Sequence, residues 1–152
     1  MRSWIFVIIT ALAMFHEVSA PTDPNPAPPA VTIAVGPTTL GEVAELIGYA
    51  PWLPDARVYV ADKAPADHSL YVGLLCPAFS GGHPYCQEMQ TPYITLYSAN
   101  IRTIAEWTMV LAHEEYHMRL PSMSEARAWD YGCEISWVER WCGEGAFRGG
   151  TR

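Results

Sequence analysis

The segment 107–120 constrains what this chain can fold into more than any other part of the sequence. It begins with the apolar run WTMVLA and ends directly before Pro121, which predicts a buried helix. The pentapeptide HEEYH at 113–117 lies in the same helix and carries imidazole and carboxylate groups into the interior, where such groups need partners. Residues four apart share a helix face, so His113 and His117 can offer two nitrogens to one metal ion.

The acidic residue after the first histidine adds a chemical role. Glu114 is placed to reach a metal-bound water without binding the metal itself, as the general base of HExxH zinc peptidases does. With five His and eleven Glu in 152 residues, chance produces this pattern in only about one such chain in a hundred. The plain alternative is a helix whose polar groups face water, and the apolar run before His113 argues against it. The motif therefore predicts a Zn2+ site and hydrolytic chemistry.

A third zinc ligand has to come from another segment. Catalytic zinc usually takes three protein ligands and a water, and no histidine follows His117. The downstream carboxylates are those of Glu125, Asp130, Glu134, Glu139 and Glu144. We expect Glu125 to be the ligand, because Pro121 forces a turn and the first turn of a returning helix can point back at the metal.

Two alternatives to this ligand remain open. Ser122 and Glu125 also fit a capping box, in which the glutamate bonds the backbone and not a metal. Asp130 or Glu134 could then supply the third ligand. Asp130 could instead accept the far N–H of a ligand histidine, or pair with Arg127 on a solvated face.

The remaining elements predict a small α+β domain. A first helix follows Thr38 or Thr39 and ends near Gly48. β-branched and aromatic residues predict strands at 57–61, 69–75 and 93–97. Asn100 is the expected cap of the HEEYH helix, and a further helix is expected from Ser122 through at least Val138.

The order of these elements resembles the gluzincin zinc peptidases, and most closely the minigluzincin or ImmA/IrrE-like members. The resemblance covers about residues 93–140: the strand YITLY, the helix with VLAHEEYH, a short turn and a helix beginning EARA. It implies a zincin-like fold with a short sheet packed on the active-site helix. His113 and His117 would then be ligands, Glu114 the base and Glu125 the third ligand. The chain departs from the family in two ways: the interval from His117 to Glu125 is short for the larger gluzincins, and Asp130 stands five residues after Glu125 and not four.

Peptide hydrolysis also requires substrate contacts. The candidates for stabilising the transition state are His83, Tyr85 and Tyr131, among which the sequence does not choose. Tyr116 lies on another helix face, where packing is expected. The strand at 93–97 could hold an extended peptide if it forms the sheet edge beside the metal helix.

The N-terminus predicts export. Residues 1–20 have a basic start, an apolar stretch and the small-residue pattern VSA, which together read as a signal peptide. Pro21 hinders cleavage after Ala20, so an N-terminal membrane tether is the alternative. Residues 21–37 are expected to be a Pro-rich linker, in which 31–35 could still form a short edge strand, and 38–152 the metallopeptidase domain. The expected location is secreted, periplasmic or membrane-tethered outside the cytoplasm.

Four cysteines in an exported chain predict two disulfides. If Cys133 and Cys142 share one unbroken helix, they are roughly 13 Å apart, beyond the roughly 7 Å that a disulfide spans. They would then pair with Cys76 and Cys86. If the helix breaks before Trp141, both pairs are local, and the turn-rich segment between Cys76 and Cys86 favours the local arrangement.

Charge narrows the possible partners. The net charge is −7, with nine Lys plus Arg, which leaves no basic patch for nucleic acid. The predicted partner is a peptide or protein substrate, and the sequence does not indicate an oligomeric state. The competing functions are a non-catalytic exported zinc-binding or interaction domain, and an amidase that acts on cell-wall peptides. Glu114 favours an enzyme, because a purely structural zinc site needs no such carboxylate.

Overall fold

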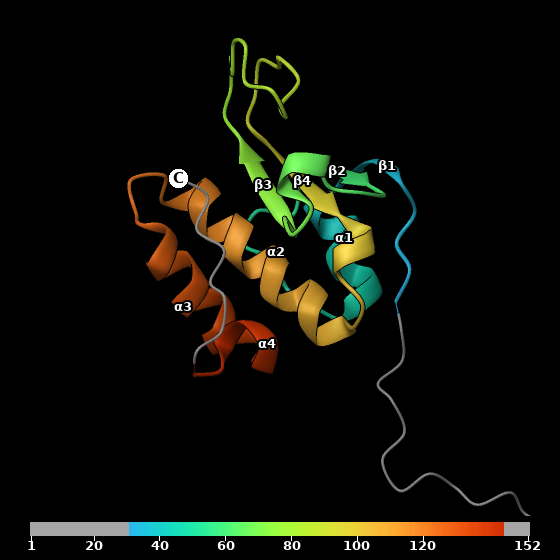
Figure 1. Ribbon diagram of the computed structural model, residues 1–152, viewed down its shortest axis with the longest axis vertical. Helices are drawn as coiled ribbons and strands as arrows, with labels where there is room; N and C mark the ends of the chain where they lie inside the picture. The colour runs from blue at the N-terminus through green and yellow to red at the C-terminus, as the bar shows by residue number, and fades with distance from the viewer. Residues whose placement is uncertain (1–30, 145–152) are drawn as a thin grey trace, which may run out of the picture.

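The fold is that of a computed structural model, which describes residues 31–144 (Figure 1). A four-stranded sheet packs with one face on the helices, which confirms the predicted α+β class. The predicted signal at 1–20, the linker residues 21–30 and the tail 145–152 lie outside the described residues. Within the described range, no helix has the length and apolar composition that a bilayer-spanning helix needs.

β3 lies at one edge of the sheet, beside the helix that carries His113 and His117. The strands are β1 (Gly36–Thr39), β2 (Arg57–Ala61), β3 (Gly73–Cys76) and β4 (Tyr93–Tyr97). Their order is β1-β2-β4-β3, with β2 and β4 parallel and the other neighbours antiparallel. The predicted strand 93–97 is therefore an inner strand, and the condition under which it could hold an extended peptide is not met. The predicted strand 69–75 starts only at Gly73, because a 3₁₀ helix at Ala66–His68 and a turn at Tyr71 precede it.

The first helix, α1 (Leu40–Ile47), has the predicted ends. The Thr39 hydroxyl accepts a hydrogen bond from the Glu42 N–H, and the Glu42 carboxylate accepts one from the Thr39 N–H. Gly48 ends the helix at a φ of 72°, in the left-handed region that favours glycine. The apolar side of α1 is buried in the core against the sheet.

The domain begins before the predicted boundary at Pro37. Ile33 is buried in the core, and Val31 packs against that core while its N–H donates to the Arg102 carbonyl at 3.1 Å. β1 then pairs with β2 from Gly36 onward. Residues 31–37 thus belong to the folded domain, because their aliphatic side chains remove apolar surface from water.

The helix that carries HEEYH, α2 (Ile104–Arg119), runs beneath the sheet (Figure 1). Thr103 is its N-cap and forms a capping box with Glu106, so the prediction of Asn100 as the cap was wrong. The Asn100 side-chain amide instead donates to the carbonyls of Ser69 and Tyr71. Asn100 therefore fixes the segment that leads into β3.

The returning segment contains two helices where one was predicted. α3 (Glu125–Ile135) ends at Ser136, whose hydroxyl donates to the Ala105 carbonyl, and α4 (Glu139–Cys142) follows. α3 packs along α2 (Figure 1). This break brings Cys133 and Cys142 within 5.7 Å, measured between Cα atoms.

Both disulfides are local. Cys133 bonds Cys142 and fastens α4 to α3, while Cys76 bonds Cys86 and closes the loop after β3. The local pairing that the sequence favoured is confirmed. Two disulfides in a small domain are typical of proteins outside the reducing cytoplasm, in agreement with the predicted compartment.

Candidate metal centre

Two helices bring three predicted ligands together. His113 and His117 stand one turn apart on α2, and Glu125 faces both from the start of α3. The Nε2 atom of His113 lies 3.1 Å from Oε1 of Glu125, and Nε2 of His117 lies 2.8 Å from Oε2. One ligand atom from each residue falls within 4.8 Å of the other two. We call this set the metal trio.

The trio has the donor set that a catalytic zinc ion takes. Zinc prefers imidazole nitrogen and carboxylate oxygen ligands, and tetrahedral geometry places such ligands about 3.3 Å apart. The separations within the trio are close to this spacing. With three protein ligands, the set also leaves one position for water or substrate. The residues therefore fit zinc.

The structure decides between the two roles considered for Glu125. Ser124 is the N-cap of α3, and its hydroxyl accepts a hydrogen bond from the Arg127 N–H. Glu125 is the first helical residue, so its side chain does not cap the helix but lies against both histidines. The capping box with Ser122 is wrong.

The two carboxylates offered as alternatives lie elsewhere on α3. Glu134 is exposed near the end of the helix and is not part of the trio. Nδ1 of His113 is buried and has no hydrogen-bond partner among the described residues, so Asp130 does not accept a hydrogen bond from it. The Trp129 ring packs on the His113 ring at 4.6 Å and holds the imidazole in place.

Glu114 is buried directly beside the trio. Its side chain is 5 % exposed, and Oε1 lies 4.0 Å from Nε2 of His113. Burial raises the pKa of Glu114, while the neighbouring His113 and His117 oppose the rise. The Leu75 N–H of β3 donates a hydrogen bond to the carboxylate. A group with a raised pKa next to a metal site is suited to accept and return a proton.

Gly73 makes room for this carboxylate. A Cβ atom at Gly73 would lie 2.5 Å from Oε1 of Glu114 and 3.0 Å from its Cδ. These separations are shorter than van der Waals contact, so any side chain at this position would displace the carboxylate. The sequence analysis missed Gly73 and Leu75; their only signal was a glycine inside a predicted strand, which marks a close approach of the backbone.

The residues of the trio shift one another's pKa values. Burial alone would raise the pKa of Glu125, but hydrogen bonds with His113 and His117 outweigh burial and lower it to about 2. The hydrogen bond to Glu125 raises the pKa of His117, against the effect of burial. Glu125 is thus ionised at neutral pH, as a zinc ligand must be.

Two of the residues proposed to stabilise the transition state, Tyr85 and Tyr131, have other contacts in the structure. The Tyr85 hydroxyl donates to Asp67 and lies 2.9 Å from Nδ1 of His68. The Tyr131 ring packs on Tyr116 at 5.0 Å, the packing expected for Tyr116.

The remaining candidate, His83, lies in the same loop as Tyr85. His83 is exposed, and its Nδ1 accepts from the Tyr85 N–H. Burial raises the pKa of Tyr71, and the negative charges of Asp67 and then Glu125 add to the rise.

Known proteins provide no evidence on the function of this chain. No family model matches the chain, and neither curated proteins nor solved structures gave a match. The resemblance to gluzincins therefore stays a prediction drawn from residues 93–140. What the site can do follows from the trio and from Glu114.

Proposed function

We propose that this chain is a zinc metallopeptidase of gluzincin type, with His113, His117 and Glu125 as ligands and Glu114 as general base. The position of Glu114 carries the proposal. It is a buried carboxylate that does not belong to the trio but lies 4.0 Å from one of its nitrogens. A site that only stabilised the fold would have no use for a buried acid there.

The metal and the residues around the trio would have different roles in hydrolysis. When bound, zinc supplies a Lewis acid that lowers the pKa of water and polarises a carbonyl. Glu114 accepts the proton of the attacking water and delivers it to the leaving amine. The Leu75 N–H holds the Glu114 carboxylate in place, and Gly73 leaves the space that this carboxylate occupies.

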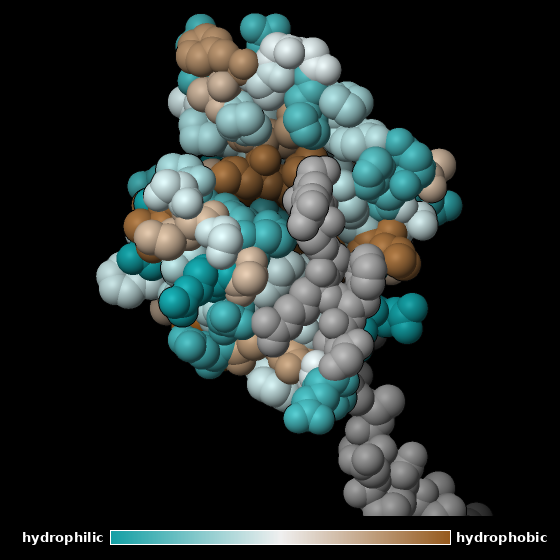
Figure 2. Space-filling view, turned by 60° about the vertical axis from the view of Figure 1, so that its left-hand side comes forward, coloured by the Kyte–Doolittle hydropathy of each residue, from teal (hydrophilic) through white to brown (hydrophobic). Residues whose placement is uncertain are grey.

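The edge of the sheet offers a place for the peptide. β3 is one of the two edge strands of the described sheet and carries both Gly73 and Leu75, the residues that contact Glu114. An extended peptide added antiparallel to an edge strand gains backbone hydrogen bonds without any sequence requirement. Figure 2 shows a hollow with an apolar floor between the loop at the top of the molecule and the helices below.

The proposed site of action is outside the cytoplasm. The two disulfides agree with an oxidising compartment. The predicted signal at 1–20 would deliver the domain there, as a secreted, periplasmic or membrane-tethered protein.

Hydrolysis of a mixture of quenched fluorescent peptides tests the proposal. We expect cleavage by the zinc-loaded protein, loss of cleavage with a chelator and recovery with added zinc. Glu114→Gln should keep zinc and lose cleavage by a factor of about 10² to 10⁴, whereas Glu134→Gln, an exposed change on α3, should leave both unchanged. Cleavage confined to cell-wall peptides would favour the amidase. Zinc binding without any cleavage would favour the non-catalytic domain.

A further inference from the structure

A second cavity lies on the face of the sheet that the helices do not cover. Its volume is about 740 Å³. The register pairs Tyr59 with Thr95 and Ala61 with Tyr97, so these outward residues of β2 and β4 form one continuous floor. The neighbouring residue Val60 points to the opposite face and is fully buried in the core. The cavity is therefore separated from α2 by the sheet.

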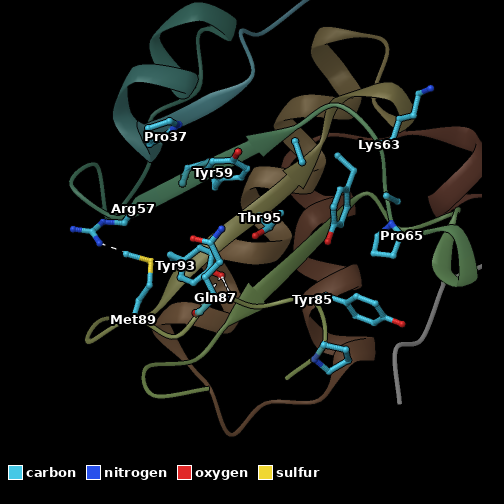
Figure 3. A pocket seen from close by; sticks show the side chains of 15 residues that line it. Pro37, Arg57, Tyr59, Lys63, Pro65, Tyr85, Gln87, Met89, Tyr93 and Thr95 are labelled. Atoms are coloured by element: carbon cyan, nitrogen blue, oxygen red, sulfur yellow. Dashed lines mark hydrogen bonds between the residues drawn. The ribbon is translucent and has the colours of Figure 1, made fainter. Parts of the chain in front are cut away.

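The loop after β3 forms one wall of this cavity and is fixed in place. Pro84, Tyr85, Gln87 and Met89 of the loop line the cavity (Figure 3). The Gln87 N–H donates to the Tyr93 hydroxyl at 2.5 Å, and the Cys76–Cys86 disulfide closes the base of the loop. Because the loop is tied at both places, the cavity is formed before any ligand arrives.

The lining is aromatic and of the size that small ligands occupy. Four tyrosines line the cavity: Tyr59, Tyr85, Tyr93 and Tyr97. Pro37 and Pro65 add rigid apolar surface at the two ends (Figure 3). Sites for organic ligands are typically cavities of about 300 to 1,000 Å³ with aromatic walls and a few polar groups. This cavity satisfies each of these criteria.

The charge of the lining is opposite to that of the chain. The whole sequence has 16 acidic and nine basic residues, yet among residues 31–144 the only charged ones that line the cavity are Arg57 and Lys63. Figure 3 shows them at opposite ends. Lys63 is also the only lysine of the chain. A ligand with an acidic group would find a cation at either end and no carboxylate in the lining.

We propose that this cavity binds a small aromatic anion, with its ring system among the tyrosines and its acid group at Arg57 or Lys63. The site goes beyond the proposed peptidase activity, since Glu114 contacts the edge strand on the helix side of the sheet. Binding there requires neither zinc nor turnover.

Two probes with nearly the same aromatic body test the proposal. Anilinonaphthalene sulfonate carries an acid group, and N-phenyl-naphthylamine does not. We expect one sulfonate probe to bind per folded chain, at least about threefold more tightly than the neutral probe. Binding should be the same with and without a zinc chelator, so that failure here and failure of the peptidase proposal can be told apart.

Variants locate the binding. Arg57→Gln combined with Lys63→Gln should remove the preference for the sulfonate, whereas Arg102→Gln, an exposed cation outside the cavity, should keep it. Ala61→Trp fills the floor and should abolish binding of both probes. If the tryptophan variant does not fold, Tyr59→Ala, which removes an aromatic ring from the floor of the cavity, is used in its place. Thermal melts identify folded variants. Unchanged binding in the folded filling variant, or equal affinity for both probes in the wild type, would overturn the proposal.

Discussion

Nε2 of His117 lies 2.8 Å from Oε2 of Glu125, although the two residues belong to different helices. The turn after α2, which contains Pro121, reverses the chain and places the first residue of α3 over the histidines of α2. Short connections between antiparallel helices produce such contacts whatever the function. What makes this contact a candidate metal centre is that a second histidine, His113, shares the same carboxylate.

The first prediction concerns the third ligand. Glu125→Ala should weaken zinc binding by more than about 100-fold, because loss of a group that merely orients a ligand already costs 10-fold to 100-fold. Competition with a fluorescent chelator measures the affinity. Glu134→Ala, on the exposed side of the same helix, is the matched control. Equal zinc affinity in the two variants would remove Glu125 from the site.

The second prediction concerns the space beside the base. In Gly73→Ala the new Cβ would meet the Glu114 carboxylate at 2.5 Å and push it away from its place. We expect turnover to fall at least about tenfold, since a shift of this size misplaces a catalytic group. Zinc content should stay unchanged because Gly73 is outside the trio. Gly81→Ala, in the exposed loop, is the control and should keep full activity.

The third prediction concerns pH in the absence of metal. The pKa of His117 is raised from 6.5, so its contribution to stability is complete below pH 6.5 and is lost as pH rises through the folded value. The pKa of Glu125 is lowered from 4.5 to about 2, so its contribution is present above pH 4.5 and is lost toward pH 2. In the metal-free protein, the trio therefore stabilises the fold most between about pH 4.5 and pH 6.5.

Thermal melts in chelator across pH 3 to 9 measure this effect. Relative to His117→Gln, the wild-type protein should have its largest advantage in melting temperature near pH 4.5 to 6.5. Added zinc should shift the advantage to higher pH, because the ligand histidines must lose their protons. An advantage that keeps growing above pH 6.5 without zinc would contradict the assigned contacts.

The fourth prediction concerns a buried carboxylate next to the base. Glu115 is fully buried and accepts hydrogen bonds from the Tyr49 hydroxyl at 2.7 Å and the Leu53 N–H at 2.6 Å. Tyr49→Phe should lower the free energy of unfolding by about 1 to 3 kcal/mol, because it leaves a buried carboxyl group with one hydrogen-bond partner fewer. Urea denaturation measures the loss. Tyr59→Phe, at an exposed position, should change stability little.

The sequence predicted those elements whose signals are local. The capped helix α1 and the strands β2 and β4 follow from propensity and spacing within a few residues. The edge position of β3 did not follow, since strand order depends on which strands pair across the sheet. A break before Trp141 was left open by the sequence, but the end of α3 at Ile135, before the expected Val138, was not predicted. It depends on a tertiary hydrogen bond from Ser136 to α2, which no pattern in the helix itself announces.

The candidate site divides in the same way. His113, Glu114 and His117 could be named from one pentapeptide, because helical geometry fixes their relation. Glu125 required a guess about the turn, and the structure places it against both histidines. Gly73 reaches the site from the sheet, and a contact between a strand and a helix far apart in the sequence leaves no local signature.

Zinc content and peptide hydrolysis, measured on the same samples of wild type and Glu114→Gln, test the central claim most directly. Both proteins are incubated with zinc, freed of excess metal by dialysis, and assayed by mass spectrometry for metal and by fluorescence for cleavage. The account predicts one zinc ion per chain in both proteins and cleavage by the wild type alone. Wild-type protein that retains no zinc, or Glu114→Gln that cleaves as fast as the wild type, would contradict it.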